Sequence, residues 1–244
     1  MNISYKGTHY HGWQIQPNGK TIQGEIEKGL SLLLREQVAV TGSGRTDTGV
    51  HATQQVAHFE YHSPLNTEDI AYKLNSYLAK DICINQIVQV EDDLHARFNA
   101  SRRTYFYHIH QKKHPFKQET SYYYHSIIDV ELIDKACDII KDYQNFECFS
   151  KVHTDVTNFN CDIFDMSWTK KDSNHLFIIT ANRFLRGMVR AVVGTLLDVG
   201  KRKTSLEDLK KILEQQDRTK AGRAVPAHGL FLEKVRYETE PFNR

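Results

Sequence analysis

The alternation of short strand-like and helix-like segments constrains the fold of this chain more than any other feature. Apolar and polar residues alternate in the strand-like segments, whereas the helix-like ones repeat apolar residues every three or four positions. No apolar run exceeds four residues, far below the roughly 20 that would span a bilayer. We therefore expect an α+β protein with helices on one face of an antiparallel sheet and no association with membranes.

A similar order of segments occurs twice along the chain. The first half shows strands near 3–5, 38–43, 54–62 and 82–90, with helices near 21–36 and 67–79. The second half shows strands near 102–111, 162–168, 175–182 and 228–237, with helices near 129–143, 184–200 and 205–216. This repetition predicts two α+β halves, residues 1–98 and 99–244, without a flexible linker between them.

Composition indicates the class of protein but not its partner. Hydrophobic residues make up 40% and charged residues 25% of the 244 residues, which is typical of a globular protein. The net charge of +2 is too small to indicate nucleic-acid binding without clustering of the basic residues. The four cysteines form no CxxC pair, and the N-terminus lacks a basic region followed by an apolar one. We expect reduced thiols, no signal peptide and a cytoplasmic location.

The loop "GSGRTDTGVHA", residues 42–52, contributes almost nothing to a hydrophobic core. Asp47 in this loop is either a turn aspartate that binds its own backbone or a functional carboxylate. The neighbouring Arg45 and the flanking glycines favour the second interpretation, since glycine lets a backbone approach a ligand closely. His51 either contacts that ligand or braces the loop, and we favour bracing.

Familiar catalytic motifs are missing from the sequence. The loop lacks the GK[ST] ending of a P-loop and the spacing of a nucleophile elbow, and the chain contains no HExxH. His108 and His110 alone are a weak metal signal. We therefore expect neither a metal nor a cofactor.

Two further segments carry candidate functional residues. Arg190 lies in "GMVRAVVGTLL", a helix that is apolar all round and hence predicted to be buried. It must reach either the surface or an anion, for which Asp47 is one candidate. Tyr105 and Tyr107 share one face of a strand. They form either part of the core or a platform for a base, with Arg102 and Arg103 beside it for phosphates.

Five blocks of the sequence, in order, resemble the TruA-type tRNA pseudouridine synthases. These are "YKGTHYHGWQIQPNGKTIQGEIEKGL", the loop "GSGRTDTGVHA", "HARFNASRRTYFYHI", "ANRFLRGMVRAVVGTLLDVG" and "PAHGLFLEKVRY". The resemblance spans nearly the whole chain. It differs from the family pattern at Lys6, where Asp is common, in a short first strand, and in the segment 104–182, which contains no Arg.

The resemblance implies a fold, a reaction and roles for named residues. The two halves would join their antiparallel sheets across a central basic RNA-binding cleft, in a homodimer. The enzyme would convert uridines 38, 39 and 40 of the tRNA anticodon stem-loop to pseudouridine, without metal or cofactor. Asp47 would be the catalytic carboxylate, paired with Arg190. Arg45 would hold the target nucleotide out of the stem, and Tyr105 would stack on its uracil.

Two other functions remain as alternatives at the level of sequence. A tRNA-binding protein or chaperone without catalysis would not need Asp47, Arg190 and Tyr105 together. A metal-dependent nuclease would need a second carboxylate near the loop, and the sequence offers none between Asp47 and Glu60.

Overall fold

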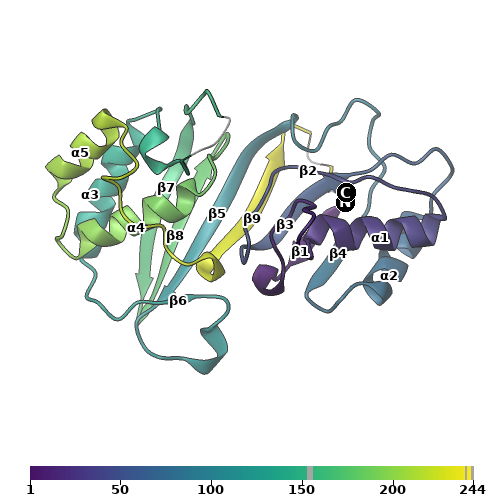
Figure 1. Ribbon diagram of the computed structural model, residues 1–244, viewed down its shortest axis with the longest axis horizontal. Coiled ribbons are helices and arrows are strands. Elements are labelled where there is room, and N and C mark those ends of the chain that lie inside the picture. Colours follow the sequence, from purple (N-terminus) through teal and green to yellow (C-terminus); the bar gives the residue numbers. More distant parts are fainter. Residues whose placement is uncertain (153–155, 240, 243–244) are drawn as a thin grey trace. The chain divides into compact units, whose positions relative to one another are not determined.

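A computed structural model describes residues 1–152, 156–239 and 241–242 of the chain (Figure 1). The chain folds into two compact units. Unit 1 comprises Met1–Arg103 and Phe231–Arg244, and unit 2 comprises Thr104–Leu230. The chain therefore passes from one unit to the other within strand β5 and again at the start of strand β9.

The sheet of unit 1 has the strand order β4-β1-β3-β9, with the short strand β2 paired to β3. Its strands are β1 (Asn2–Tyr5), β2 (Thr41–Gly42), β3 (His51–His58), β4 (Ile82–Gln86) and β9 (Leu230–Tyr237). Strand β1 pairs antiparallel with both β3 and β4, whereas β3 and β9 run parallel. Such a parallel pair requires a long connection, and here unit 2 lies between the two strands in the sequence.

Two helices of unit 1, α1 (Ile22–Leu34) and α2 (Thr67–Tyr77), contact one another, and α2 also contacts β4 (Figure 1). The Thr21 side chain caps α1 by accepting a hydrogen bond from the Gly24 amide. Helix α1 ends at Leu34 rather than near residue 36, because Arg35 takes a left-handed conformation with φ 58°. Ile22, Ile26 and Leu30 bury the face of α1 that the sequence pattern predicted.

Unit 2 is built on the strands β5, β8 and β7 in that order, with the short strand β6 paired to β5. Their bounds are β5 (Ala100–His110), β6 (Tyr122–Tyr123), β7 (Ile163–Lys171) and β8 (Asn174–Ala181). Strands β7 and β8 form an antiparallel hairpin closed by Asp172 and Ser173. The strands thus extend into the polar segment predicted as a turn, because Asp172 supplies the positive φ of 54° that a two-residue turn needs.

The helices of unit 2 are α3 (Val130–Lys141), α4 (Met188–Gly200) and α5 (Leu206–Gln215) (Figure 1). Helix α3 packs on β7 and also contacts α4 and α5. Helix α4 begins at Met188, later than predicted, because Gly187 takes φ 74°. Short 3-10 turns occupy Gly7–His9, Pro115–Lys117, Glu147–Phe149 and Ala227–Gly229.

The structure confirms the expected mixed α+β architecture with mostly antiparallel strands. The two compact units differ in their limits from the halves 1–98 and 99–244, since β9 pairs with β3 and brings residues 231–244 into unit 1. The division into functional halves stays a prediction. In the described residues, no helix is both long enough and apolar enough to cross a membrane.

Candidate active site

The loop that carries Asp47 connects β2 to β3 in unit 1 and is anchored at its beginning by a polar network. The Ser43 amide donates to the Val56 carbonyl at 2.7 Å, and the Ser43 hydroxyl donates to Oε1 of Gln55 at 2.6 Å. Nε2 of the fully buried Gln55 then donates to the Gly44 carbonyl at 3.0 Å. Each of these buried polar groups is satisfied, which fixes the start of the loop in one conformation.

The middle of the loop is held by the end of β1 and by the segment that follows it. Trp13 donates its amide hydrogen to the Thr46 carbonyl at 3.1 Å, and the Tyr5 hydroxyl lies 2.8 Å from Oγ1 of Thr46. This close approach requires glycine at position 12. Gly12 has φ 89°, and a Cβ there would lie 2.5 Å from the Thr46 carbonyl oxygen.

Asp47 itself begins a tight turn. The Val50 amide donates to the Asp47 carbonyl at 3.1 Å, and Gly49 supplies a positive φ of 78°. The Asp47 side chain is half-buried, whereas Arg45 is exposed. Asp47 thus lies at the first position of a turn, and the turn belongs to a loop fixed on both sides.

The glycines of this loop have structural reasons that the sequence did not reveal. Gly42 lies against the Trp13 ring, where an added Cβ would come within 2.5 Å of Nε1, and Gly49 provides the turn. At Gly44 a Cβ would meet nothing closer than Nε of Arg103, at 3.9 Å. Close approach to a nucleotide therefore stays a prediction for Gly44, while Gly42 and Gly49 serve the fold.

His51 supports the end of the loop through buried contacts, in agreement with the interpretation favoured from the sequence. Its ring is fully buried, with Nδ1 accepting the Gly7 amide hydrogen at 3.0 Å. The ring also packs on Phe231, with centroids 4.6 Å apart. Because Nδ1 accepts a hydrogen bond, it carries no proton in this arrangement.

Arg103 has a structural role that the sequence did not reveal, and its predicted contact with phosphate stays a prediction. Its guanidinium donates to three backbone carbonyl oxygens: Ser43 at 2.9 Å, Arg97 at 3.0 Å and Ala100 at 3.2 Å. It thereby connects the start of the Asp47 loop to the chain preceding β5. Sequence reasoning missed this role, as it missed that of Gln55, because no local pattern identifies a carbonyl that a distant side chain will reach.

Arg190 lies in the first turn of α4 in unit 2. The helix is buried almost all round, as predicted, and Arg190 is half-buried. Its Nε donates to the Val225 carbonyl at 2.7 Å, and the Val225 amide donates back to the Arg190 carbonyl at 3.1 Å. A carbonyl of unit 2 therefore satisfies part of the guanidinium, and the predicted pairing with Asp47 stays a prediction.

Tyr105 lies on β5, also in unit 2, and its ring meets Phe184 edge-to-face at 5.0 Å and 87°. The contact fixes the plane of a half-buried ring. Tyr107 on the same face belongs to the core: it is fully buried, and its hydroxyl donates to the Pro226 carbonyl at 2.8 Å. Burial raises the pKa of Tyr107, while the nearby Arg190 cation opposes that shift. Tyr107 is therefore a core residue, whereas a platform for a base at Tyr105 stays a prediction.

The four predicted site residues are divided between the units. The 43–50 loop in unit 1 contains both Arg45 and Asp47, whereas Tyr105 and Arg190 belong to unit 2. Among residues outside 153–155, 240 and 243–244, no group of three or more His, Cys, Asp or Glu side chains is placed to hold a metal ion.

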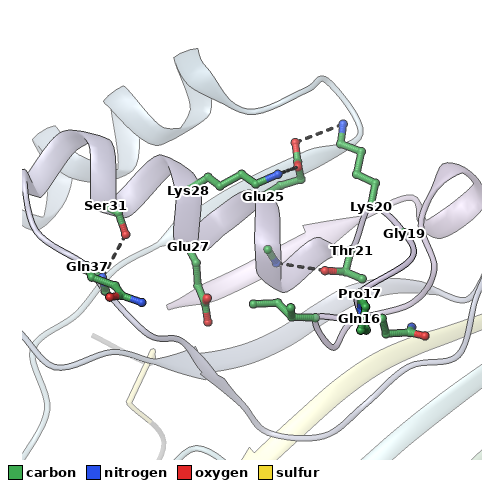
Figure 2. Close-up of a pocket in the computed structure, with 13 residues that line it drawn as sticks. Gln16, Pro17, Gly19, Lys20, Thr21, Glu25, Glu27, Lys28, Ser31 and Gln37 are labelled. Carbon is green, nitrogen blue, oxygen red and sulfur yellow. Dashed lines mark hydrogen bonds and ion pairs between the residues drawn. The ribbon is translucent and has the colours of Figure 1, made fainter.

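A separate groove lies beside α1 in unit 1, with a volume of about 630 Å³ (Figure 2). Three of its charged groups pair with each other: Glu25 binds Lys20 at 3.2 Å and Lys28 at 3.3 Å. The Ser31 hydroxyl accepts the Val38 amide hydrogen at 3.0 Å. None of the predicted site residues lines this groove, and the Ser31 bond joins α1 to the segment that leads into β2.

Comparison with known proteins identifies the class to which this fold and loop belong. The family model described as tRNA pseudouridine synthase matches residues 1–99 and 141–238. The chain therefore belongs to the tRNA pseudouridine synthase family, and it is an isomerase that converts uridine to pseudouridine in tRNA.

The sequences of individual relatives align with nearly the whole chain. The chain is 48% identical to tRNA pseudouridine synthase A of Bacteroides fragilis over 242 residues, covering 98% of this chain and 96% of that protein. It is 46% identical to the protein of the same name from Parabacteroides distasonis, with 98% and 96% covered. The protein of that name from Bacillus subtilis is 38% identical, with 97% of each chain covered.

Proposed function

We propose that Asp47 is the catalytic carboxylate of this isomerase, and that its targets are uridines 38, 39 and 40 in the anticodon stem-loop of tRNA. The observation that carries the proposal is the setting of Asp47. It sits half-buried at a turn whose backbone is fixed by hydrogen bonds before and after it. Such a fixed carboxylate is what a reaction at a single sugar carbon needs.

The reaction is redox-neutral and accounts for the need for a carboxylate. The bond from C1′ to N1 breaks, the uracil turns, and C5 joins C1′; C5 then loses a proton and N1 gains one. The Asp47 carboxylate either attacks C1′ as a nucleophile or takes a proton from C2′ as a base. Both roles require Asp47 to be ionised.

The other three site residues serve the nucleotide and the charge of Asp47. A uridine within a stem cannot turn, so it must leave the base stack at a cost of a few kcal/mol. Arg45, exposed on the same loop, would help hold the target nucleotide out of the stem, and Tyr105 would stack on the uracil. A cation opposes the rise in a carboxyl pKa that burial causes, and we assign this role toward Asp47 to Arg190.

Further parts of the proposal concern the setting of the enzyme. We place it in the cytoplasm, where it meets its tRNA substrate, as a homodimer with the anticodon stem-loop bound in a basic cleft between its two halves. Lysine and arginine contacts to phosphates would make the affinity fall as salt rises.

The substitution Asp47→Asn tests the catalytic assignment. Asparagine keeps the size and most hydrogen bonds of the side chain but cannot act as a nucleophile or a base. We expect pseudouridine formation to fall at least about 100-fold, while the affinity for tRNA changes little. The measurement is a single-turnover assay of tritium release from C5 of labelled tRNA, with binding followed separately.

Asp92→Asn is the matched control, since Asp92 is an exposed loop aspartate of the same unit. It should retain full turnover. Normal turnover in Asp47→Asn would refute the assignment of Asp47, and loss of tRNA binding in that variant would reassign it to substrate binding.

A further inference from the structure

An exposed aromatic ring lies close to the Asp47 loop in unit 1, and the proposed reaction does not use it. Phe98 is 77% exposed. Its ring stacks on that of His95, with centroids 4.3 Å apart and an interplanar angle of 29°. The other side of the stack is His58, which meets His95 edge-to-face at 4.7 Å.

Hydrogen bonds from the backbone amides of residues 96–98 to the two histidine rings fix this stack. Nδ1 of His95 accepts the amide hydrogens of Arg97 at 3.1 Å and of Phe98 at 3.3 Å. Nδ1 of His58 accepts the Ala96 amide hydrogen at 3.1 Å. The Phe98 ring is thus held in place before any ligand arrives, which reduces the entropy lost on binding.

Arginine side chains accompany the ring within unit 1. The Arg97 guanidinium lies 5.9 Å from the centre of the Phe98 ring. Residues 94–103 of the same unit contain three arginines but no Asp or Glu, and Arg102 within this segment is exposed. A flat apolar ring flanked by cations suits a nucleotide, whose base stacks and whose phosphate is an anion.

Arg103 connects this ring to the catalytic loop. The same guanidinium that donates to the Ser43 carbonyl at 2.9 Å donates to the Arg97 carbonyl at 3.0 Å. Both segments belong to unit 1, so the ring keeps a fixed position relative to the loop of Asp47. A group held on the Phe98 ring would be held in register with that loop.

We propose that Phe98 and Arg97 form a second nucleotide-binding platform, on which an unpaired base of the bound tRNA stacks on the Phe98 ring while its phosphate meets Arg97. This inference rests on the proposed function, because it takes tRNA as the ligand. A second protein molecule is a poorer occupant, since stable protein interfaces bury about 800 Å² on each partner, whereas this surface is one ring bordered by cations.

The test measures tRNA affinity at fixed salt for the wild-type protein, Phe98→Leu and Phe98→Tyr. Leucine keeps an apolar side chain but removes the stacking surface, so we expect its Kd to rise about 5- to 100-fold. Tyrosine keeps the ring and should bind within about twofold of the wild type. Tyr72→Leu is the control, as Tyr72 is 74% exposed on α2 of the same unit, and it should leave the Kd unchanged.

Arg97→Gln adds a second readout. Removing one phosphate contact should reduce the slope of log K against log salt by about 1. Unchanged affinity in Phe98→Leu, when the wild type binds tRNA, would overturn the platform and leave the proposed function intact. A changed sedimentation coefficient in Phe98→Leu with unchanged tRNA affinity would make the surface a protein interface instead. Failure of the wild type itself to bind tRNA would overturn the proposed function.

Discussion

The 43–50 loop of unit 1 holds Asp47 and the first turn of α4 in unit 2 holds Arg190, but the two positions are fixed by different means. Trp13, Gln55 and Arg103 donate hydrogen bonds to backbone carbonyl oxygens of residues 43–46, and these bonds fix the loop that carries Asp47. Helix α4 fixes Arg190 by burying nearly every neighbour on the helix. One position is therefore set by polar contacts from distant parts of the sequence, and the other by apolar packing.

The two regions share one device despite this difference. In both, a backbone carbonyl oxygen occupies the space where a side chain would begin at a glycine. A Cβ on Gly7 would lie 2.0 Å from the Val50 carbonyl oxygen, at the end of the Asp47 loop. A Cβ on Gly194 would lie 1.9 Å from the Arg223 carbonyl oxygen, next to the segment that accepts from Arg190. Glycine therefore allows two backbone segments to approach each other this closely in each region.

The substitutions Gly7→Ala and Gly194→Ala test this shared device and have the largest expected effects. Each forces a backbone shift, which costs about 1–3 kcal/mol of the free energy of unfolding. In α4, alanine regains about 1 kcal/mol of helix propensity, so Gly7→Ala should be the more harmful. Urea unfolding with an unchanged m-value is the measurement. Gly44→Ala, where a Cβ has room, should change stability by less than about 0.5 kcal/mol.

Equal stability of Gly7→Ala and the wild type would break the comparison. It would mean that the end of the loop can move away from Gly7 without cost. The loop would then not be fixed on both sides, and the argument for Asp47 from its setting would lose its support.

Arg190→Lys sharpens the comparison with a smaller effect on stability. Lysine keeps the charge but has no group equivalent to Nε, so the bond to the Val225 carbonyl is lost. We expect a loss of about 0.5–1.5 kcal/mol in the free energy of unfolding. If the fixed direction of the guanidinium matters to catalysis, turnover should fall by more than this loss of stability explains. Full turnover in a destabilised variant would reduce Arg190 to a structural residue.

The same contrast explains what the sequence could predict. The burial of α4 and the core face of α1 follow from periodic patterns, because each residue's environment repeats along its own helix. The residues of the 43–50 loop have no period, and only the family resemblance assigned a role to Asp47. The supports of that loop could not be predicted, since Gln55 and Arg103 act on carbonyl oxygens brought near by the fold.

Errors at element boundaries had local causes. The late start of α4 and the early end of α1 both follow from left-handed residues, Gly187 and Arg35. Glycine is a common signal for such a conformation, but arginine is not. The sequence pattern also could not predict that Tyr107 is buried and Tyr105 only half-buried. Alternation shows that two residues share a face of a strand, but it does not show how far the core extends along that face.

The pH dependence of stability gives the last and smallest test, in the supports of the β7–β8 hairpin of unit 2. Nδ1 of the buried His175 accepts the indole hydrogen of Trp168 at 3.0 Å. Burial, with a smaller effect of Lys170, lowers the pKa of His175 from its usual 6.5. Above pH 6.5 the ring is neutral in both the folded and the unfolded protein. As the pH falls below that value, the unfolded chain binds the proton first, so stability decreases until the folded pKa is reached.

His175→Gln removes this group while keeping an oxygen that can accept from Trp168. Between about pH 6.5 and pH 5.5, the free energy of unfolding of the wild type should fall more steeply than that of the variant, by at most about 1.4 kcal/mol per pH unit. Urea unfolding at both pH values gives the two slopes. In unit 1, burial likewise lowers the pKa of His58, so His58→Gln should change the slope in the same direction. Identical slopes in wild type and His175→Gln would show that the hydrogen bond from Trp168 does not keep the His175 ring neutral.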